Sequence, residues 1–84
     1  MPGVEKQSIQ IIFSEELKAY RRVNRISQIR MAKLLHMSER SYISLEHGQN
    51  GPSAVTLLLY MLQLDEHEVI VLLNKLLEKQ ALRL

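Results

Sequence analysis

Apolar residues recur every three or four positions along almost the whole of this 84-residue chain, and that spacing restricts the fold more than any other feature. Phe13, Leu17 and Tyr20 stand at i, i+4 and i+7, which predicts a helix over about residues 14–24 with one buried stripe. No segment favours a strand over a helix on this pattern. The sequence therefore predicts an all-α fold, a compact bundle of four to five helices with a long amphipathic helix at its C-terminus.

Serine and glycine mark where the predicted helices begin and end. Ser14, followed by two glutamates, is a good helix N-terminus because carboxylates favour the positive end of the helix dipole. The preceding residues 8–13 form either an extension of that helix or a short strand, and the extension is the preferred interpretation. Ser27 and Ser38 begin two further short helices, and Gly48 supplies a left-handed residue at the end of the second.

The second half of the chain predicts two more helices. Pro52 and Ser53 begin a helix that ends near Leu62, and Asp65 with Glu68 forms a capping box for a fifth helix that continues to the C-terminus. These boundaries divide the chain into an N-terminal arm or helix extension (1–13), a central domain (14–64) and a C-terminal helix (65–84).

Composition limits the chemistry that is open to the chain. There is no cysteine, and the separations between His36, His47 and His67 match no metal-ligand spacing. A single aspartate and no glycine-rich phosphate loop give little support to an enzyme. The longest mostly apolar run, residues 54–62, is far below the roughly 20 residues of a membrane span, and the first ten residues lack the layout of a signal peptide. We therefore expect a cytoplasmic protein with no catalytic residue, metal, cofactor or membrane contact.

Charged and apolar residues are distributed unevenly. Residues 1–48 hold eight Lys and Arg against five acids, whereas residues 49–84 hold three against four. Between Lys18 and Arg40, seven basic side chains accompany a single acid, Glu39. Eleven of the fifteen leucines follow residue 56. The first half therefore favours electrostatic contacts and the second half favours apolar ones.

Two short helices separated by a tight turn at residues 35–38 are typical of a helix-turn-helix unit. Around this unit, residues 17–62 resemble the helix-turn-helix domain of the Cro and cI phage repressors and their bacterial relatives, the XRE-like family. The spacing agrees without insertion or deletion, and the resemblance rests on Leu17, Arg21, Ile26-Ser27-Gln28, Met31-Ala32, Leu34-Leu35, Met37-Ser38, Tyr42, Leu45-Glu46, Gly48 and Pro52-Ser53. It implies that residues 14–64 bind DNA in a regulator of transcription, such as a repressor.

Two positions depart from the family's pattern. The turn residue is usually glycine and here is His36. Histidine tolerates a positive φ better than most residues, so we expect the turn to form, but with backbone strain that glycine would not have. The loop at residues 49–51 carries no basic side chain, where many relatives place Lys or Arg against phosphate. We therefore expect weaker contacts with the DNA backbone than in those relatives.

The helix that follows Ser38 separates its side chains into two faces. At about 100° per residue, Tyr42 and Leu45 point to one side and are expected to be buried. An arginine can bond guanine bidentately, a glutamate can accept from cytosine N4, and an aliphatic side chain can touch a thymine methyl. The exposed face holds Glu39, Arg40, Ile43, Ser44 and His47. The resemblance implies base contacts for Glu39, Arg40 and Ser44, with Ile43 lying between them.

Other expected contacts lie outside this face. The resemblance implies that the side chain and backbone N–H of Gln28 meet a phosphate. It also implies a largely buried ion pair between Arg21 and Glu46. Four more basic side chains are phosphate candidates: Arg25, Arg30, Lys33 and His47. For Arg30 and Lys33, as for Arg22, a solvated surface is the alternative explanation.

The predicted fifth helix carries an apolar arc wider than one core requires. Its apolar residues span about 180°, compared with roughly 100° for a face against a single core. Either the helix is deeply sunk in its own domain, or part of the arc meets a second copy of the chain, which is the preferred interpretation. The residues assigned to this dimer interface are Leu72, Leu73, Leu76, Leu77 and Leu84.

Together these features predict a homodimeric, sequence-specific regulator of transcription. It would bind a palindromic operator in double-stranded DNA through the helix at residues 39–47. The alternative is a protein-interaction module, antitoxin-like or a regulator subunit, that binds another protein through its apolar C-terminal helix. No small-molecule substrate or effector is expected, because the chain has no room for a separate ligand-binding domain.

Overall fold

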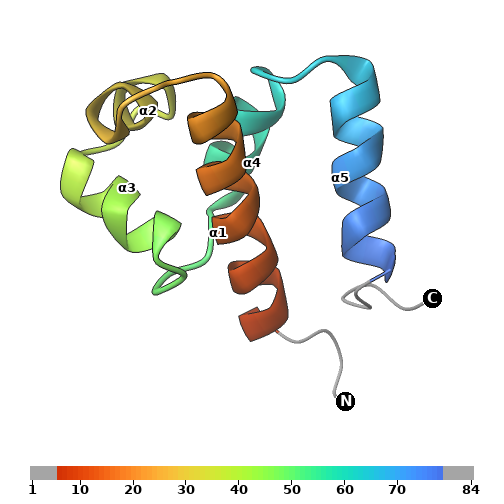
Figure 1. Cartoon of the computed structure of the whole chain (residues 1–84). Helices are drawn as coiled ribbons and strands as arrows, with labels where there is room; N and C mark the ends of the chain where they lie inside the picture. The colour runs from red at the N-terminus through yellow and green to blue at the C-terminus, as the bar shows by residue number, and fades with distance from the viewer. Residues whose placement is uncertain (1–5, 79–84) are drawn as a thin grey trace.

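The computed structural model describes residues 6–78, and every regular element in that range is a helix (Figure 1). The helices are α1 (Lys6–Val23), α2 (Gln28–Leu34), α3 (Glu39–Glu46), α4 (Ala54–Met61) and α5 (Glu66–Glu78). The prediction of an all-α bundle with four to five helices is confirmed. None of these helices combines the length and the apolar character that a membrane span needs.

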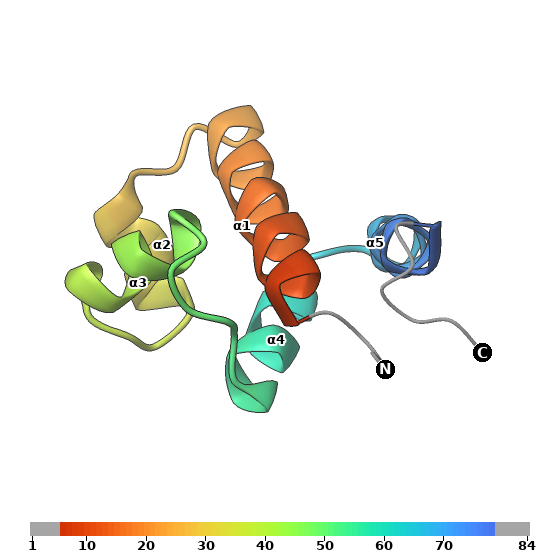
Figure 2. The same cartoon turned by 90° about the horizontal axis from the view of Figure 1, so that it is seen from below.

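α1 runs through the middle of the molecule and separates two groups of elements. In both views, α2 and α3 lie on one side of α1 and α5 lies on the other (Figures 1 and 2). α4 connects the two sides, because it follows α3 along the chain and leads into α5. The two helices joined by the tight turn therefore face away from α5.

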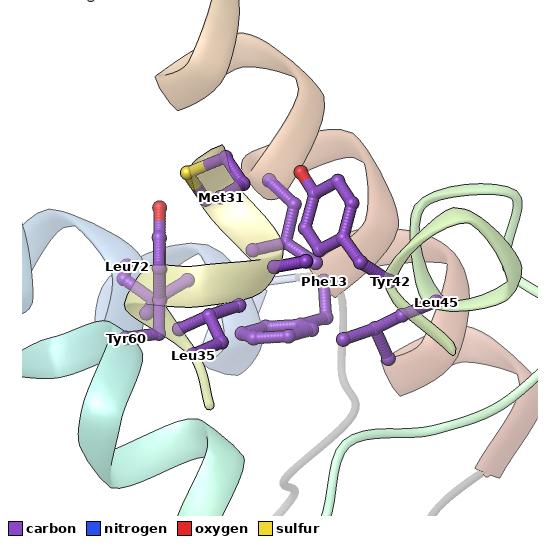
Figure 3. Packing of buried hydrophobic residues seen from close by; sticks show 9 residues of the cluster. Phe13, Met31, Leu35, Tyr42, Leu45, Tyr60 and Leu72 are labelled. Carbon is purple, nitrogen blue, oxygen red and sulfur yellow. The ribbon is translucent and has the colours of Figure 1, made fainter. Parts of the chain in front are cut away.

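The core is formed by buried side chains from all five helices and the residue that ends α2 (Figure 3). Tyr60 of α4 packs against α1, with edge-to-face contacts to Phe13 and Tyr20 at centroid distances of 5.3 and 5.6 Å. Such aromatic pairs stabilise a core beyond the area that they bury. The fully buried members with the largest side chains are Tyr42, Leu17, Met31 and Leu35.

The expected helix start at Ser14 is wrong, and the helix extension is the correct alternative. α1 passes through Ser14, whose hydroxyl is buried and donates to the Ile11 carbonyl at 2.8 Å instead of capping the helix. The reason is that the apolar stripe continues N-terminally through Ile12 and Phe13, which are both buried. The boundary expected between residues 13 and 14 therefore lies inside a continuous helix.

The other predicted helix starts are confirmed. The hydroxyls of Ser27, Ser38 and Ser53 each accept the backbone N–H three residues ahead, in every case at 3.1 Å. At the start of α5, the Asp65 N–H donates to the Glu68 carboxylate at 2.9 Å, and the Glu68 N–H donates back to Asp65 at 2.7 Å. These bonds satisfy backbone donors that a helix cannot pair internally, so local sequence fixes where four helices begin.

α1, α2 and α3 all end in the same backbone motif. The second residue after each helix has a positive φ: 56° at Arg25, 55° at His36 and 75° at Gly48. Each motif has the two backbone hydrogen bonds of a Schellman cap. The N–H of the left-handed residue donates to the carbonyl three residues back, at 3.2, 3.1 and 3.1 Å in chain order. The N–H of the next residue donates to the carbonyl five residues back, at 2.9, 2.9 and 3.0 Å. The strained turn at His36 is thus confirmed. The equivalent turn at Arg25 was not predicted, because an arginine, and not a glycine or asparagine, holds the left-handed position.

Replacing Arg25 or His36 with glycine is expected to raise the free energy of unfolding by about 0.5–1 kcal/mol. A left-handed residue other than glycine costs about 1–2 kcal/mol, and the greater freedom of glycine in the unfolded chain offsets part of the gain. Urea denaturation measures the change. Gly48→Ala is the matched control and should lower stability, because it creates the same strain at the third turn. Loss of stability in both glycine variants would show that these turns are not strained.

α5 is attached to the rest of the protein by few strong contacts. Leu72 is buried in the core, with 3% of its surface exposed, and Lys75 Nζ forms an ion pair with Glu16 of α1 at 2.6 Å. The assignment of Leu72 to a dimer interface is therefore wrong, because its own protomer already encloses it. Leu76 is half-buried, and Leu84 lies outside the described residues.

Candidate nucleic-acid interface

α3 has one buried face and one accessible face. Tyr42 and Leu45 are buried as expected, at 0% and 4% exposure, and they anchor the helix against the core. Ser38 caps its start, and the left-handed Gly48 follows its end. The helix is therefore held rigidly while its opposite face stays open.

The accessible face contains a shallow hollow of about 380 Å³. Glu39 and Arg40 are exposed, and Ile43 and Ser44 are half-buried. We call this surface the α3 outer face, and it is lined by Glu39, Arg40, Ile43 and Ser44. The structure thus brings together all four residues that the sequence assigned to base contacts.

Within residues 6–78, the charged groups of the α3 outer face have no ion-pair partner. Neither Glu39 nor Arg40 forms an ion pair with any residue that the structure describes. An exposed carboxylate and guanidinium that are not paired with each other can both bind an external group. His47 is also exposed, but it ends α3 and does not line the hollow.

The basic candidates for phosphate contacts lie around α2, away from the hollow. Arg30 and Lys33 are exposed on α2, and Arg25 is exposed in the turn that precedes it. Within residues 6–78, none of the three forms an ion pair. Their exposure fits both a phosphate contact and a solvated surface.

The expected ion pair between Arg21 and Glu46 is confirmed, and it belongs to a larger network. Arg21 Nε donates to Glu46 Oε2 at 2.7 Å, and its Nη2 donates to Oε1 at 3.1 Å. The same carboxylate accepts from the Tyr42 hydroxyl and from Gln28 Nε2, the latter at 3.0 Å. Because the four residues belong to α1, α2 and α3, the network joins these three helices.

The network shifts the proton affinities of its members. Burial on its own would raise the pKa of Glu46, but hydrogen bonds from Arg21, Tyr42 and Gln28 outweigh it, so the pKa lies below its ordinary value. The hydrogen bond to Glu46 raises the pKa of Arg21. Burial, followed by the bond to Glu46, raises the pKa of Tyr42. The carboxylate therefore stays ionised at neutral pH.

The position of Gln28 changes what was expected of it. Its side-chain amide was assigned to a phosphate, but in the structure the amide nitrogen donates to the Glu46 carboxylate. A second amide hydrogen and the backbone N–H at the first position of α2 are the groups left for an anion. Sequence spacing could have shown that Tyr42 and Glu46 meet, since they are four residues apart on one helix. It could not have placed Gln28, which comes from another helix.

Two rows of exposed apolar side chains lie on the C-terminal helices. On α5, Ile70, Leu73 and Leu77 have 54%, 44% and 48% of their surface exposed. Of these three, Leu73 and Leu77 were assigned to a dimer interface. The row on α4 was not predicted, although residues 48–64 contain no charged residue and could have indicated it. It consists of Val55 (65%) and Leu58 (60%) of α4 and of Leu62 (77%), the residue that caps the end of this helix.

Metal chemistry finds no support in the part of the chain that the structure describes, where no group of three potential ligands comes together. The features that the structure describes are an accessible face on α3, exposed basic side chains around α2, and apolar rows on the two C-terminal helices. The amino-acid sequence matches no protein-family model, and comparisons with curated proteins and with solved structures also find no match.

Proposed function

We propose that this protein is a homodimeric regulator of transcription that binds DNA sequence-specifically through α3. The observation that carries the proposal is the α3 outer face, where four chemically suitable side chains share one hollow on a helix that is buried on its other side. An α-helix fits the major groove of B-DNA, which is about 12 Å wide. The resemblance of residues 17–62 to the Cro and cI repressors and the XRE-like family supports the same function.

Three polar residues of the α3 outer face match hydrogen-bonding groups on base edges. Arg40 can donate two bonds to guanine O6 and N7, and Glu39 can accept from the amino group of cytosine. Ser44 can donate to or accept from a base. Backbone contacts would come from the free N–H of Gln28 and from the exposed basic side chains Arg25, Arg30, Lys33 and His47.

The position of α5 supports a dimer with two separate reading helices. α5 lies on the opposite side of α1 from α3 (Figure 2), so a second copy that packs on α5 would leave both α3 helices uncovered. Symmetric DNA-binding dimers of this kind contact half-sites about 34–36 Å apart, one turn of the double helix. A palindromic operator follows from this symmetry.

Replacing Leu73 and Leu77 together with lysine is expected to remove self-association and to weaken binding to a palindromic duplex. Both side chains are exposed in the protomer, so the change should not disturb its own core. Light scattering at micromolar concentration measures the mass, and fluorescence anisotropy measures DNA binding. Asn74→Lys, on the same helix and also exposed, is the control for added charge. A wild-type protein that stays monomeric and binds a single half-site tightly contradicts the dimer.

The salt dependence of binding tests whether DNA is the partner. Each neutralised phosphate contributes about −0.9 to the slope of log K against log salt. Because the 49–51 loop is uncharged, we expect a slope between about −4 and −6, shallower than the roughly −10 of extensive binders. Arg30→Ala and Lys33→Ala each report whether that side chain contributes. A flat dependence between low and physiological salt contradicts DNA binding.

A second candidate function is a protein-interaction module, as in an antitoxin or a regulator subunit. The exposed row on α4 favours it, because large exposed apolar patches mark interaction sites. A homodimer covers its apolar surface and is soluble alone. A subunit that needs a different protein is expected to be monomeric or to aggregate when purified, which light scattering distinguishes.

A further inference from the structure

We infer that the α3 outer face recognises a C5-methylated cytosine, through Glu39 and Ile43 acting together. The inference rests on the proposed function and adds the identity of one base and the effect of its methylation. It makes DNA methylation a regulator of binding. The observations that carry it are the spacing, the exposure and the chemistry of these two side chains.

Glu39 and Ile43 are neighbours on the surface of α3. They are four residues apart, which places their Cβ atoms about 5–6 Å from each other on one helix face. Both line the same hollow. The carboxylate is exposed and has no ion-pair partner among the described residues, and the isoleucine beside it is half-buried. The pair therefore offers a strong hydrogen-bond acceptor next to an apolar surface.

The major-groove edge of 5-methylcytosine has the complementary pattern. Its N4 amino group is a donor, and the adjacent C5 carries a methyl group in the same groove. Glu39 can accept from the amino group while Ile43 covers the methyl. Both groups of the pair are then satisfied by one base.

The other bases satisfy only part of this pattern. Unmethylated cytosine donates to Glu39 but offers nothing to Ile43. Thymine carries the methyl, but its O4 is an acceptor and faces the carboxylate without a hydrogen between them. Adenine offers an amino donor but no methyl group. The expected order at this position is 5-methylcytosine first, cytosine second and thymine last among the pyrimidines.

The experiment uses a duplex that the full-length protein binds. Each cytosine is replaced in turn with 5-methylcytosine, and the dissociation constant is measured by fluorescence anisotropy. Burial of one methyl group is expected to strengthen binding about fourfold at one position of each half-site, and about fifteenfold when both half-sites are methylated. Cytosine methylated on N4 is the matched control, because the same added carbon then crowds Glu39, and it should weaken binding.

Variants assign the effect to the two side chains. Ile43→Ala should remove the preference for the methylated base, and Ile43→Val, which keeps an apolar surface, should retain it. Glu39→Gln should reduce the discrimination against thymine relative to 5-methylcytosine, because an amide can donate to O4. Circular dichroism checks that each variant is folded.

Two results overturn the inference while leaving the proposed function intact. One is sequence-specific binding with equal affinity for cytosine and 5-methylcytosine at every position, which would leave Ile43 as an ordinary surface residue. The other is a methyl preference that survives in Ile43→Ala. Failure to bind any duplex sequence-specifically instead removes the proposed function itself.

Discussion

Replacing Glu46 with alanine is expected to lower the free energy of unfolding by about 3–5 kcal/mol, because a mostly buried charge loses its partner. Arg21 would be left with only 19% of its side chain exposed, and the buried Tyr42 hydroxyl would lose its acceptor. Urea denaturation at neutral pH measures the loss. A domain of this size has about 5–15 kcal/mol in total, so the variant should be close to unfolding.

A double-mutant cycle isolates the ion pair from the other losses. Arg21→Ala alone should also destabilise the protein, and the double variant should lose less than the sum of the single changes. Glu46→Gln is the matched control, since it keeps an acceptor oxygen of nearly the same shape and should cost less than Glu46→Ala. Strictly additive losses would show that the two side chains do not interact in solution.

The same carboxylate gives stability a dependence on pH. The pKa of Glu46 is lower in the folded protein than its ordinary value of 4.5, so the unfolded chain binds the proton more readily. Its contribution is therefore complete above pH 4.5 and is lost as the pH falls through the folded pKa. In Glu46→Gln this acid-dependent loss should be smaller, which urea denaturation across that pH range measures.

Substitutions on the α3 outer face are expected to change which DNA sequence is bound. Arg40→Ala should cost about 1–3 kcal/mol on the preferred site and should relax the preference for one guanine in each half-site. Glu39→Gln should shift the preference at a neighbouring position toward adenine, because an amide both donates and accepts. The measurement is a binding profile over all single-base variants of the site. Lys33→Ala, a basic residue outside the hollow, is the control and should weaken all sequences by a similar factor or leave them unchanged.

The helix starts could be predicted because their signals are local. Ser27, Ser38 and Ser53 each bond to a backbone N–H only three residues away, so no tertiary contact is needed to place them. The start of α1 could not be predicted in this way. Ser14 has the composition of a helix cap, but burial of Ile12 and Phe13 against the core extends the helix past it.

The α3 outer face could be predicted because one helix carries all of it. A period of about 3.6 residues places its four members on one side once the ends of the helix are known. The side chains that meet across helices were harder to predict. The resemblance supplied Arg21 and Glu46, but the bond from Gln28 to the same carboxylate depends on how α2 packs against α3.

The role of the C-terminal helix was only partly predictable. Its apolar arc does not distinguish residues that face the protomer's own core from residues that stay exposed. Leu72 belongs to the first kind, and Leu73 and Leu77 belong to the second. The spacing is the same in both cases, and the packing of α5 beside α1 decides between them.

Selection of bound sequences from a pool of random duplex DNA tests directly whether α3 recognises a specific DNA sequence. We expect the wild-type protein to enrich one palindromic motif, and Arg40→Ala to enrich a motif that has lost a guanine preference in each half-site. An enriched motif whose shape is unchanged by Arg40→Ala and Glu39→Gln would contradict the assignment of base contacts to α3. No enrichment at all would contradict sequence-specific DNA binding and would favour the protein-interaction module.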